Sequence, residues 1–513
     1  MSKLYKLVLI PLCLSLCTVL ATATNINDAR ENEAVEKAAI EYLDNLVRVT
    51  YLYEDIDLTS ETVLADELSK VKSKDSLVTN ESNRELEYIV EKANYLKAMR
   101  SMNGLYRTNF DVSYSVEDIA IQGERATAEV TEYINFQYVG CDFMSGASNS
   151  YTVELVKYDY DWVVAKVDGG DFYVGTESQT FDYEKEMATL QQAALATNID
   201  QGTTIYEPAV TYSTNYRPYI GANAAAYAQT YTDTTGASNS TARYNANFKR
   251  FADNDCQNFA SQSVWAGFGG SNSVTAIEEH KLPMDTEGSG ATSLWYGAVA
   301  GASDSEKTPS WTSCEYFRNY ITGNPTSSNG IVASTHRTTG GFGNIVSTPS
   351  DLLGTVLHVT NPGHATWGHA VIVTQATSLN RNGVYFSGHT SNRLNYNLQE
   401  MYGSQNIYVI VPSSFCNTTD ETAYVYPTLY APQAAGNSVT LKAAGNRVFY
   451  ELNTVVTLPN GTSNGFTYNN TSNYSRSLTL SATGIYKITI YAKETSSTPS
   501  ANRQIVSYTI RVT

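Results

Sequence analysis

The period of the hydrophobic pattern changes along this chain, and each period restricts the elements that a region can form. Apolar residues recur at helical spacing between about residues 28 and 100, as in NEAVEKAAIEYLDNLVRV. They then alternate with polar residues, as in FDVSYSVEDIAI and SYTVELVKYDYDW, which is typical of antiparallel strands with one buried face. This order predicts a compact α+β domain of the cystatin-like or nuclear-transport-factor-like kind over residues 24–205.

Two further regions follow. In residues 206–415, the alanine-rich segment YIGANAAAYAQTY predicts a helix, and DLLGTVLHVT, WGHAVIVTQA, GVYFSGHT and QNIYVIVP predict later strands, which again gives α+β order. Residues 416–513 contain short strands and turns, and they predict an immunoglobulin-like β-sandwich, although the cysteine pair and tryptophan of antibody-type domains are absent. Several domains fit a length of 513 residues, because single cores rarely exceed about 250 to 300 residues.

The N-terminus has the three parts of a secretory signal. Lys3 and Lys6 precede an apolar run over residues 7–20, and the small residues of Ala21-Thr22-Ala23 form a cleavage site. The alternative, a membrane anchor, needs about 20 uninterrupted apolar residues, whereas this run is shorter and contains Pro11. We therefore expect residues 1–23 to be removed, no transmembrane anchor, and a secreted or cell-surface location.

Charge and cysteine content exclude several classes of partner and site. A net charge of −17 without a basic stripe repels nucleic acid, so nucleic acid is not expected as a partner. Four cysteines remain beyond the signal, namely Cys141, Cys256, Cys314 and Cys416, with no C-x-x-C pair, which argues against a zinc ribbon or a redox dithiol. Whether one pair forms among Cys141, Cys314 and Cys416 stays open.

The segment DNDCQNFASQ places Cys256 at the predicted start of a helix. With Asn254 as N-cap and Gln257 in the position of a capping box, Cys256 falls in the first turn, where unpaired N–H groups favour a thiolate. The alternative is an apolar stripe, since Ala260, Val264 and Phe268 follow at intervals of four. The polar neighbours favour a functional role, because a core stripe does not need them; they include Asp255, Asn258 and Gln262.

A catalytic cysteine needs a base, and His369 is the best candidate among six histidines. It starts the apolar strand in WGHAVIV, and the next predicted strand, GVYFSGHT, ends in His389. In a hairpin, His389 would lie near His369 and fix its tautomer, with Ser387 and Asn392 as alternatives. His364 and His369 lack a carboxylate or cysteine cluster, so we expect no metal and no other cofactor.

Several motifs together resemble the putative amidase domain family, a papain-like group in secreted bacterial proteins. The resemblance rests on YIGANAAAYAQTY, DNDCQNFASQSVWAGF, LWY, WTSCEYFRNYI, WGHAVIV and VYFSGHTSNR in this order, over roughly residues 218 to 400. It implies a papain-like cysteine amidase domain, related to cysteine, histidine-dependent cell-wall amidohydrolases. In it, Cys256 attacks, His369 is the base and His389 is the third polar residue.

The resulting expectation is hydrolysis of an amide or peptide bond through a thioester, with bacterial cell-wall peptide as the substrate that the resemblance implies. The Cys256 N–H would hold the oxyanion, and Asp255, Asn258 and Gln262 would shape the site. Two alternatives stay open. The chain could be a surface adhesion or binding protein with a non-catalytic amidase-like domain and a C-terminal domain that binds a cell-surface ligand. It could also transfer the acyl group to an amine.

Overall fold

The fold is described from a computed structural model. It covers residues 29–47, 95–169, 188, 216–235, 244–251, 255–270, 295–303, 307–323, 330–360, 367–390, 392–403, 405–416, 423–426, 433–493, 495–497 and 504–513. The predicted signal peptide at residues 1–23, the predicted N-cap Asn254 and the histidine His364 lie outside the described residues. Within them, no helix is long and apolar enough to cross a lipid bilayer.

The chain divides into two compact units, and the first consists of residues 1–102, 110–134 and 148–187. Its described part contains a helix over residues 29–47 and an antiparallel sheet built from β1 (Arg107–Gln122), β2 (Arg125–Tyr138), β3 (Ser145–Tyr158) and β4 (Asp161–Gly169). One face of the helix buries Val35, Ala39, Leu43 and Leu46 in a core with apolar residues of the sheet. The predicted order of helix and antiparallel strands is therefore confirmed.

The second unit contains the region around Cys256. Its described elements are β5 (Tyr216–Pro218), α5 (Gly221–Thr230), α6 (Cys256–Gly267), α8 (Pro309–Thr312), α9 (Cys314–Gly323), β6 (Gly330–Thr338), β7 (Val356–Thr360), β8 (Trp367–Ala376), β9 (Val384–Gly388), β10 (Arg393–Asn397), α10 (Leu398–Tyr402) and β11 (Ile407–Cys416). The strands lie in the order β10-β9-β8-β7-β11-β5, and β6 pairs with β11. Neighbouring strands are antiparallel, so this region is α+β, as predicted.

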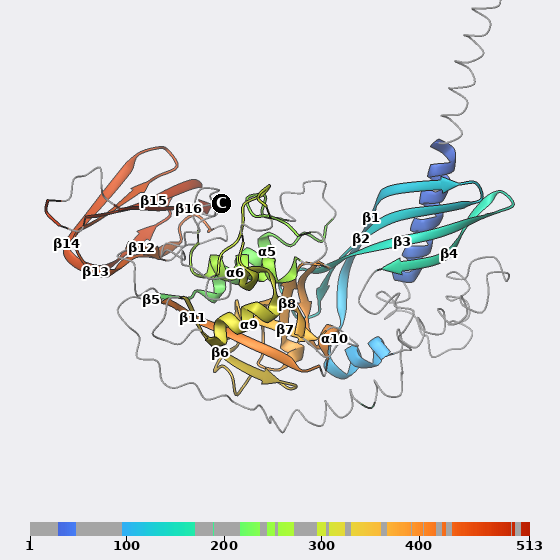
Figure 1. Ribbon diagram of the computed structural model, residues 1–513, viewed down its shortest axis with the longest axis horizontal. Coiled ribbons are helices and arrows are strands. Elements are labelled where there is room, and N and C mark those ends of the chain that lie inside the picture. The colour runs from blue at the N-terminus through green and yellow to red at the C-terminus, as the bar shows by residue number, and fades with distance from the viewer. Residues whose placement is uncertain are drawn as a thin grey trace, which may run out of the picture. The chain divides into compact units, whose positions relative to one another are not determined.

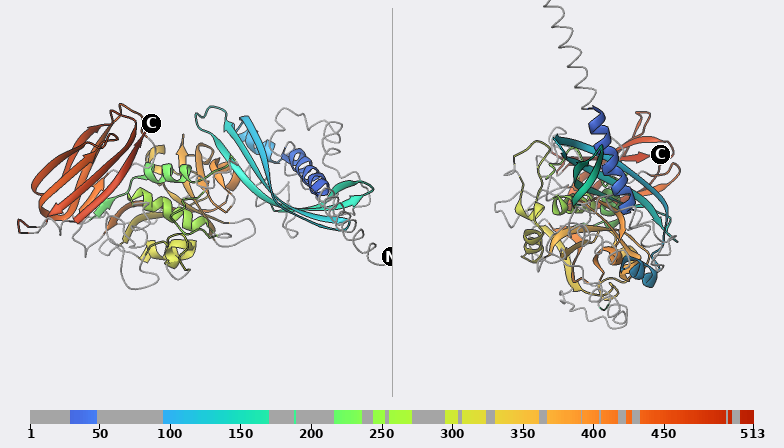
Figure 2. Two further views of the ribbon diagram at one scale, coloured as in Figure 1. Left: turned by 90° about the horizontal axis from the view of Figure 1, so that it is seen from above. Right: turned by 90° about the vertical axis from the view of Figure 1, so that its right-hand side faces the viewer.

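Helices α5 and α6 pack against each other and against β8, and α9 also contacts β8 (Figures 1 and 2). The core between helices and strands is rich in tryptophan. The rings of Trp295 and Trp311 lie 4.7 Å apart, and Phe248 stacks on Trp311 with ring centroids 5.9 Å apart. Trp265 of α6 meets the Trp311 ring at 74°. These large fixed rings hold α6 and α8 in one position relative to each other.

A close approach of backbone fixes the start of α5. A Cβ atom on Gly221 would lie 1.9 Å from the carbonyl oxygen of Leu353, so only glycine fits there. On the other side of this contact, Gly354 has a φ of +76°, in the left-handed region that favours glycine. The first residue of α5 therefore packs directly against the turn that leads into β7.

The second unit also takes in residues 103–109 and 135–147. Residues at the start of β3 pair with β10, with Ala147 opposite Arg393. Arg107 forms a buried ion pair with Glu400, and the hydroxyl of Tyr138 donates to the other oxygen of Glu400 over 2.7 Å. The second unit thus includes residues that precede the predicted boundary at residue 206.

The C-terminal strands form a separate antiparallel sheet. Its members are β12 (Ala423–Tyr426), β13 (Ser438–Thr457), β14 (Ser463–Thr479), β15 (Gly484–Lys493) and β16 (Gln504–Val512), and β13 pairs with β12, β14 and β15. Tyr486, Ile488 and Ile490 are buried, whereas Lys487 is exposed, as the alternation predicts. These five strands belong to one hydrogen-bonded sheet, and the immunoglobulin-like sandwich stays a prediction.

Candidate active site

Cys256 is the first residue of α6, and both interpretations of its position hold in part. The helix is buried along its length, and Ala260, Val264 and Phe268 form the expected apolar stripe beneath it. The Cys256 side chain itself is 7% exposed. The N-cap is Asp255 instead of the predicted Asn254, and its side chain makes no capping bond. Because the first turn has N–H groups without intrahelical acceptors, the sulfur lies at the positive end of the helix.

Four groups surround the sulfur of Cys256. The side chain of His369 on β8 is within hydrogen-bonding reach of it, and so is the backbone N–H of Ala370. The carbonyl oxygen of Gly368 lies 4.0 Å from the sulfur. The fourth group is the thiol of Cys314, the first residue of α9, which hydrogen bonds to Cys256. The start of α6 therefore meets the start of β8, as the order of the motifs predicts, together with a second cysteine.

The environment favours a thiolate on Cys256. Two neighbours hold the pKa of the Cys256 thiol well below its ordinary value. Cys314 acts through a hydrogen bond, and His369 acts through its charge and a hydrogen bond. Burial opposes this shift. The same hydrogen bond and burial raise the pKa of Cys314 well above its ordinary value. Cys256 is thus the more acidic of the two thiols. Since the two residues begin α6 and α9, the dipoles of both helices favour a negative charge on Cys256.

Sequence reasoning missed the role of Cys314. It considered this residue only as one member of an open disulfide question, whereas Cys314 and Cys141 are free thiols in the structure. Its signal in the sequence is weak, because nothing in WTSCEYFRNYI distinguishes a cysteine beside the site from a buried core cysteine.

A second histidine, His358 on β7, lies behind the site with a fixed tautomer. Arg318 donates to its Nδ1 over 3.1 Å, and because a guanidinium can only donate, Nδ1 must accept. Nε2–H of His358 therefore donates to Oε1 of Gln257 over 2.8 Å. Burial and the nearby charges of Arg318 and His369 hold the pKa of His358 well below its ordinary value. A neutral His358 with both nitrogens occupied acts as a support for α6 instead of a base.

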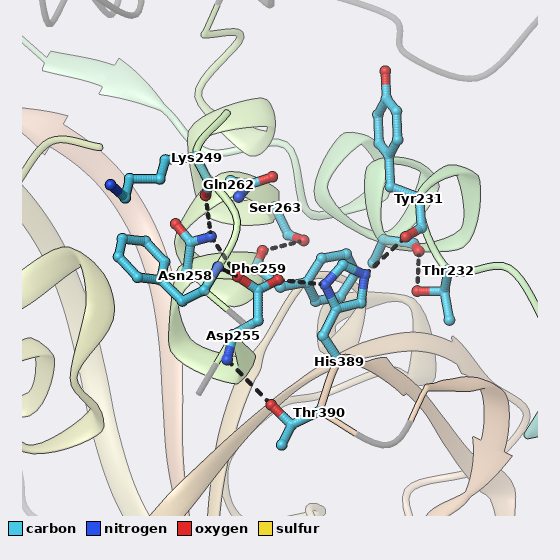
Figure 3. A network of polar contacts seen from close by, with 12 residues as sticks. Tyr231, Thr232, Lys249, Asp255, Asn258, Phe259, Gln262, Ser263, His389 and Thr390 are labelled. Carbon is cyan, nitrogen blue, oxygen red and sulfur yellow. Dashed lines mark hydrogen bonds and ion pairs between the residues drawn. The ribbon is translucent and has the colours of Figure 1, made fainter. Parts of the chain in front are cut away.

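His389 does not orient His369, which corrects the predicted role. Its Nδ1 lies 2.7 Å from Oδ2 of Asp255, and its Nε2 lies 2.8 Å from the carbonyl oxygen of Tyr231 (Figure 3). Both ring nitrogens are therefore occupied by other partners. The reason lies in where the strand ends: Ile372 of β8 pairs with Ser387, β9 ends at Gly388, and His389 lies in the turn that follows instead of on a paired strand.

The other predicted site residues form bonds that fix α6. Asn258 donates to the carbonyl oxygen of Lys249 and to Oδ1 of Asp255, over 2.9 and 2.8 Å. Its own Oδ1 accepts from Nε1 of Trp311 over 2.8 Å. Gln262 accepts a hydrogen bond from the hydroxyl of Tyr227 over 2.7 Å. These side chains shape the site by holding the helix, since their partners are groups of the surrounding scaffold.

Two further candidates also have other partners. The alternative orienter Ser387 lies 3.3 Å from the hydroxyl of Thr374 and accepts from the backbone N–H of Asn395 over 3.1 Å. Within the described part of the chain, no group of three histidine, cysteine, aspartate or glutamate residues could hold a metal ion. The arrangement at Cys256 and His369 is that of an activated nucleophile beside a proton carrier.

Replacing Cys314 should make Cys256 less acidic. In Cys314→Ala the strongest stabilising hydrogen bond to the thiolate is lost, so the pKa of Cys256 rises and its alkylation by iodoacetamide at pH 6 slows by about tenfold or more, as a shift of one unit implies. Cys314→Ser retains a donor and should lie between this variant and the wild type. Cys141→Ala is the matched control, and an alkylation profile of Cys314→Ala that superimposes on the wild type would refute this role.

The buried neutral His358 should make stability depend on pH. Its folded pKa lies below its unfolded value, so between these two pKa values only the unfolded state binds the proton. Protonation of His358 in the unfolded state therefore leaves the free energy of unfolding unchanged above about pH 6.5. Below this pH it lowers the free energy of unfolding by roughly 1.4 kcal/mol per pH unit. Urea unfolding followed by tryptophan fluorescence at pH 7.5 and 5.5 should show a smaller loss for His358→Gln than for the wild type. Equal losses would contradict the assignment.

Comparison with known proteins finds one family for the region that holds this site. Residues 218–411 match the family model of the putative amidase domain, a segment that includes Cys256, His369 and His389. A search of curated proteins finds no match. The matched segment runs from the last residue of β5 into β11, and a domain of this kind points to hydrolysis of amide bonds. The segment from residue 218 to residue 411 is thus similar to the putative amidase domain family, as the motifs in the sequence indicate.

Proposed function

We propose that this chain is a secreted cysteine amidohydrolase or peptidase that cleaves amide bonds in bacterial cell-wall peptides through a thioester. The observation that carries the proposal is the sulfur of Cys256, at the start of α6, in contact with His369 and with a pKa well below that of an ordinary thiol. A thiolate of this kind is a nucleophile that can attack an amide carbonyl without the help of a metal.

The reaction would proceed in two steps. The Cys256 thiolate attacks the carbonyl carbon, and the negative charge moves to the carbonyl oxygen. His369, as imidazolium, protonates the departing amine, and the acyl group stays on the sulfur as a thioester. His369 then removes a proton from water, which attacks the thioester and releases the acid. The backbone N–H of Cys256, in the first turn of α6, supports the oxyanion because it has no acceptor within the helix.

The fold supports a papain-like arrangement. In unit 2 a buried helix carries the cysteine at its first residue, and an antiparallel strand carries the histidine. We extend the proposal to the flanking regions, with a cystatin-like or nuclear-transport-factor-like domain before the amidase segment and an immunoglobulin-like domain after it. The latter would bind a cell-surface ligand and bring the enzyme to its substrate.

Export and the choice of substrate rest on the sequence. The basic residues, apolar run and small residues at positions 1–23 support secretion. Cell-wall peptide follows from the resemblance to cell-wall amidohydrolases and from the location outside the membrane that a signal peptide implies. The net charge of −17 argues against a nucleic acid partner.

Purified peptidoglycan tests the proposal. Wild-type protein should release free amino groups from it, and Cys256→Ala should lose this activity by a factor of about 10³ or more because the nucleophile is absent. His369→Ala should lose about 10² to 10⁴, the usual contribution of a general base. Cys141→Ala serves as control.

Three results would decide between the proposal and its alternatives. Full activity of Cys256→Ala would reject the cysteine mechanism. A wild type that binds peptidoglycan without releasing amino groups would support a binding protein. A new amide product in the presence of added amine would identify acyl transfer as the reaction.

A further inference from the structure

His389 directly follows β9 and contacts the ends of two helices, α5 and α6. Its ring lies between the carbonyl oxygen of Tyr231, at the C-terminal end of α5, and the carboxylate of Asp255, at the N-cap of α6 (Figure 3). One face of the ring stacks on Phe259, with centroids 3.8 Å apart and planes 22° apart. Asp255 and His389 are 4% and 2% exposed. The three elements are therefore connected through one buried imidazole.

The contacts of His389 determine how many protons it shares with Asp255. The Tyr231 carbonyl oxygen can only accept, so Nε2 carries a proton. A second proton must lie between Nδ1 and Oδ2 of Asp255, which are 2.7 Å apart. A neutral imidazole has one N–H, so the pair holds one more proton than an imidazole beside a carboxylate.

Charged and titratable groups come near the ring from the segment before α6 and from its N-cap. From the segment before α6, Tyr244 packs against His389 with centroids 4.9 Å apart at 74°, and the Arg250 guanidinium lies over the Tyr244 ring at 3.9 Å. From the end of α5, the backbone oxygen of Tyr231 accepts a hydrogen bond from the ring. Among the described residues, Asp255 is the acidic group that pairs with the ring.

Asp255 connects His389 to Cys256, the next residue in the chain. Its Oδ1 accepts from the backbone N–H of Phe251 over 3.0 Å and from Nδ2 of Asn258 over 2.8 Å. Its own backbone N–H donates to the hydroxyl of Thr390 over 3.2 Å. Both the side chain and the backbone of the residue directly before Cys256 are therefore held from the end of β9 and from the first turn of α6.

We propose that Asp255 and His389 form a protonated clamp that positions Cys256 for attack. His389 is a positioning residue that acts through Asp255, which fixes the sulfur and the backbone N–H of Cys256 relative to β8. This inference rests on the proposed role of Cys256 as nucleophile. It assigns His389 a function different from that of a third residue in contact with His369, and it identifies Asp255 as its partner.

The variant Asp255→Asn tests the shared proton. The new amide is of similar size and can donate to Nδ1 only when His389 is neutral, with the proton on Nε2 still bonded to Tyr231. A second proton on the His389 ring at lower pH then sets two donors against each other and opens the clamp. The rate of Cys256 alkylation by iodoacetamide, and kcat, should therefore fall at least tenfold between pH 7.5 and 5.5, beyond any change in the wild type.

The variant His389→Phe tests the position of the sulfur. It keeps the stacking on Phe259 but loses both hydrogen bonds, so kcat should fall by about 10 to 100-fold while KM changes little, since small misplacements of reacting groups have effects of this size. Asp255→Asn alone should show the additional pH dependence of the alkylation rate. The double variant Asp255→Asn/His389→Phe should not show it, because it has no imidazole to protonate. His336→Gln, at a buried histidine on β6, is the control and should behave as wild type.

The results separate failure of the clamp from failure of the proposed function, because alkylation needs no substrate. The wild type could lack amidase activity while alkylation of Cys256 in Asp255→Asn still slows more at low pH than in the wild type. This outcome would support the clamp and reject the proposed hydrolase function. Amide hydrolysis with a wild-type pH profile in Asp255→Asn would overturn the clamp. So would wild-type kcat and alkylation in His389→Phe. If His389→Phe fails to fold by circular dichroism, the similar-sized Asp255→Asn decides alone.

Discussion

The burial of a polar helix is the constraint on which the site depends. All 12 residues of α6 are buried, and six of the first eight carry polar or thiol side chains, so each must find a partner or lower the stability of the fold. Four side chains have partners on other elements, namely His358 for Gln257, Trp311 for Asn258, the Trp311 carbonyl for Ser261 and Tyr227 for Gln262. Ser263 donates to the Phe259 carbonyl within the helix. A helix held on several sides in this way keeps its first residue in a fixed place.

That fixed place is where the chemistry can occur. Cys256 lies where the positive ends of α6 and α9 meet, with the Cys314 thiol and His369 as immediate neighbours. A charge in such a buried setting is stabilised by oriented groups instead of water, which is the usual way in which proteins obtain a reactive thiolate. The same burial keeps His358 neutral, so the two histidines near the sulfur have different roles. His369 carries protons to and from the reacting atoms in the proposed mechanism, whereas His358 supports the helix.

Local patterns were sufficient to predict part of this site. A polar segment before an apolar stripe indicates a helix start, and this placed Cys256 correctly, although the cap is Asp255 instead of Asn254. Alternation identified β8 and β9, and with them His369. The partners of His389 could not be predicted in this way, because they depend on where β9 and α5 end. Cys314 was missed for a similar reason, since its distance to Cys256 is set by the packing of α8 and α9 and not by local sequence.

The most direct measurement is competitive alkylation of the whole protein with limiting iodoacetamide at pH 6, followed by peptide mapping. If the environment of Cys256 makes it a thiolate at this pH, its peptide should be modified well before those of Cys141, Cys314 and Cys416, and faster than a free thiol in solution. Equal modification of the four cysteines, or faster modification of Cys314, would contradict the account that assigns the nucleophile to Cys256.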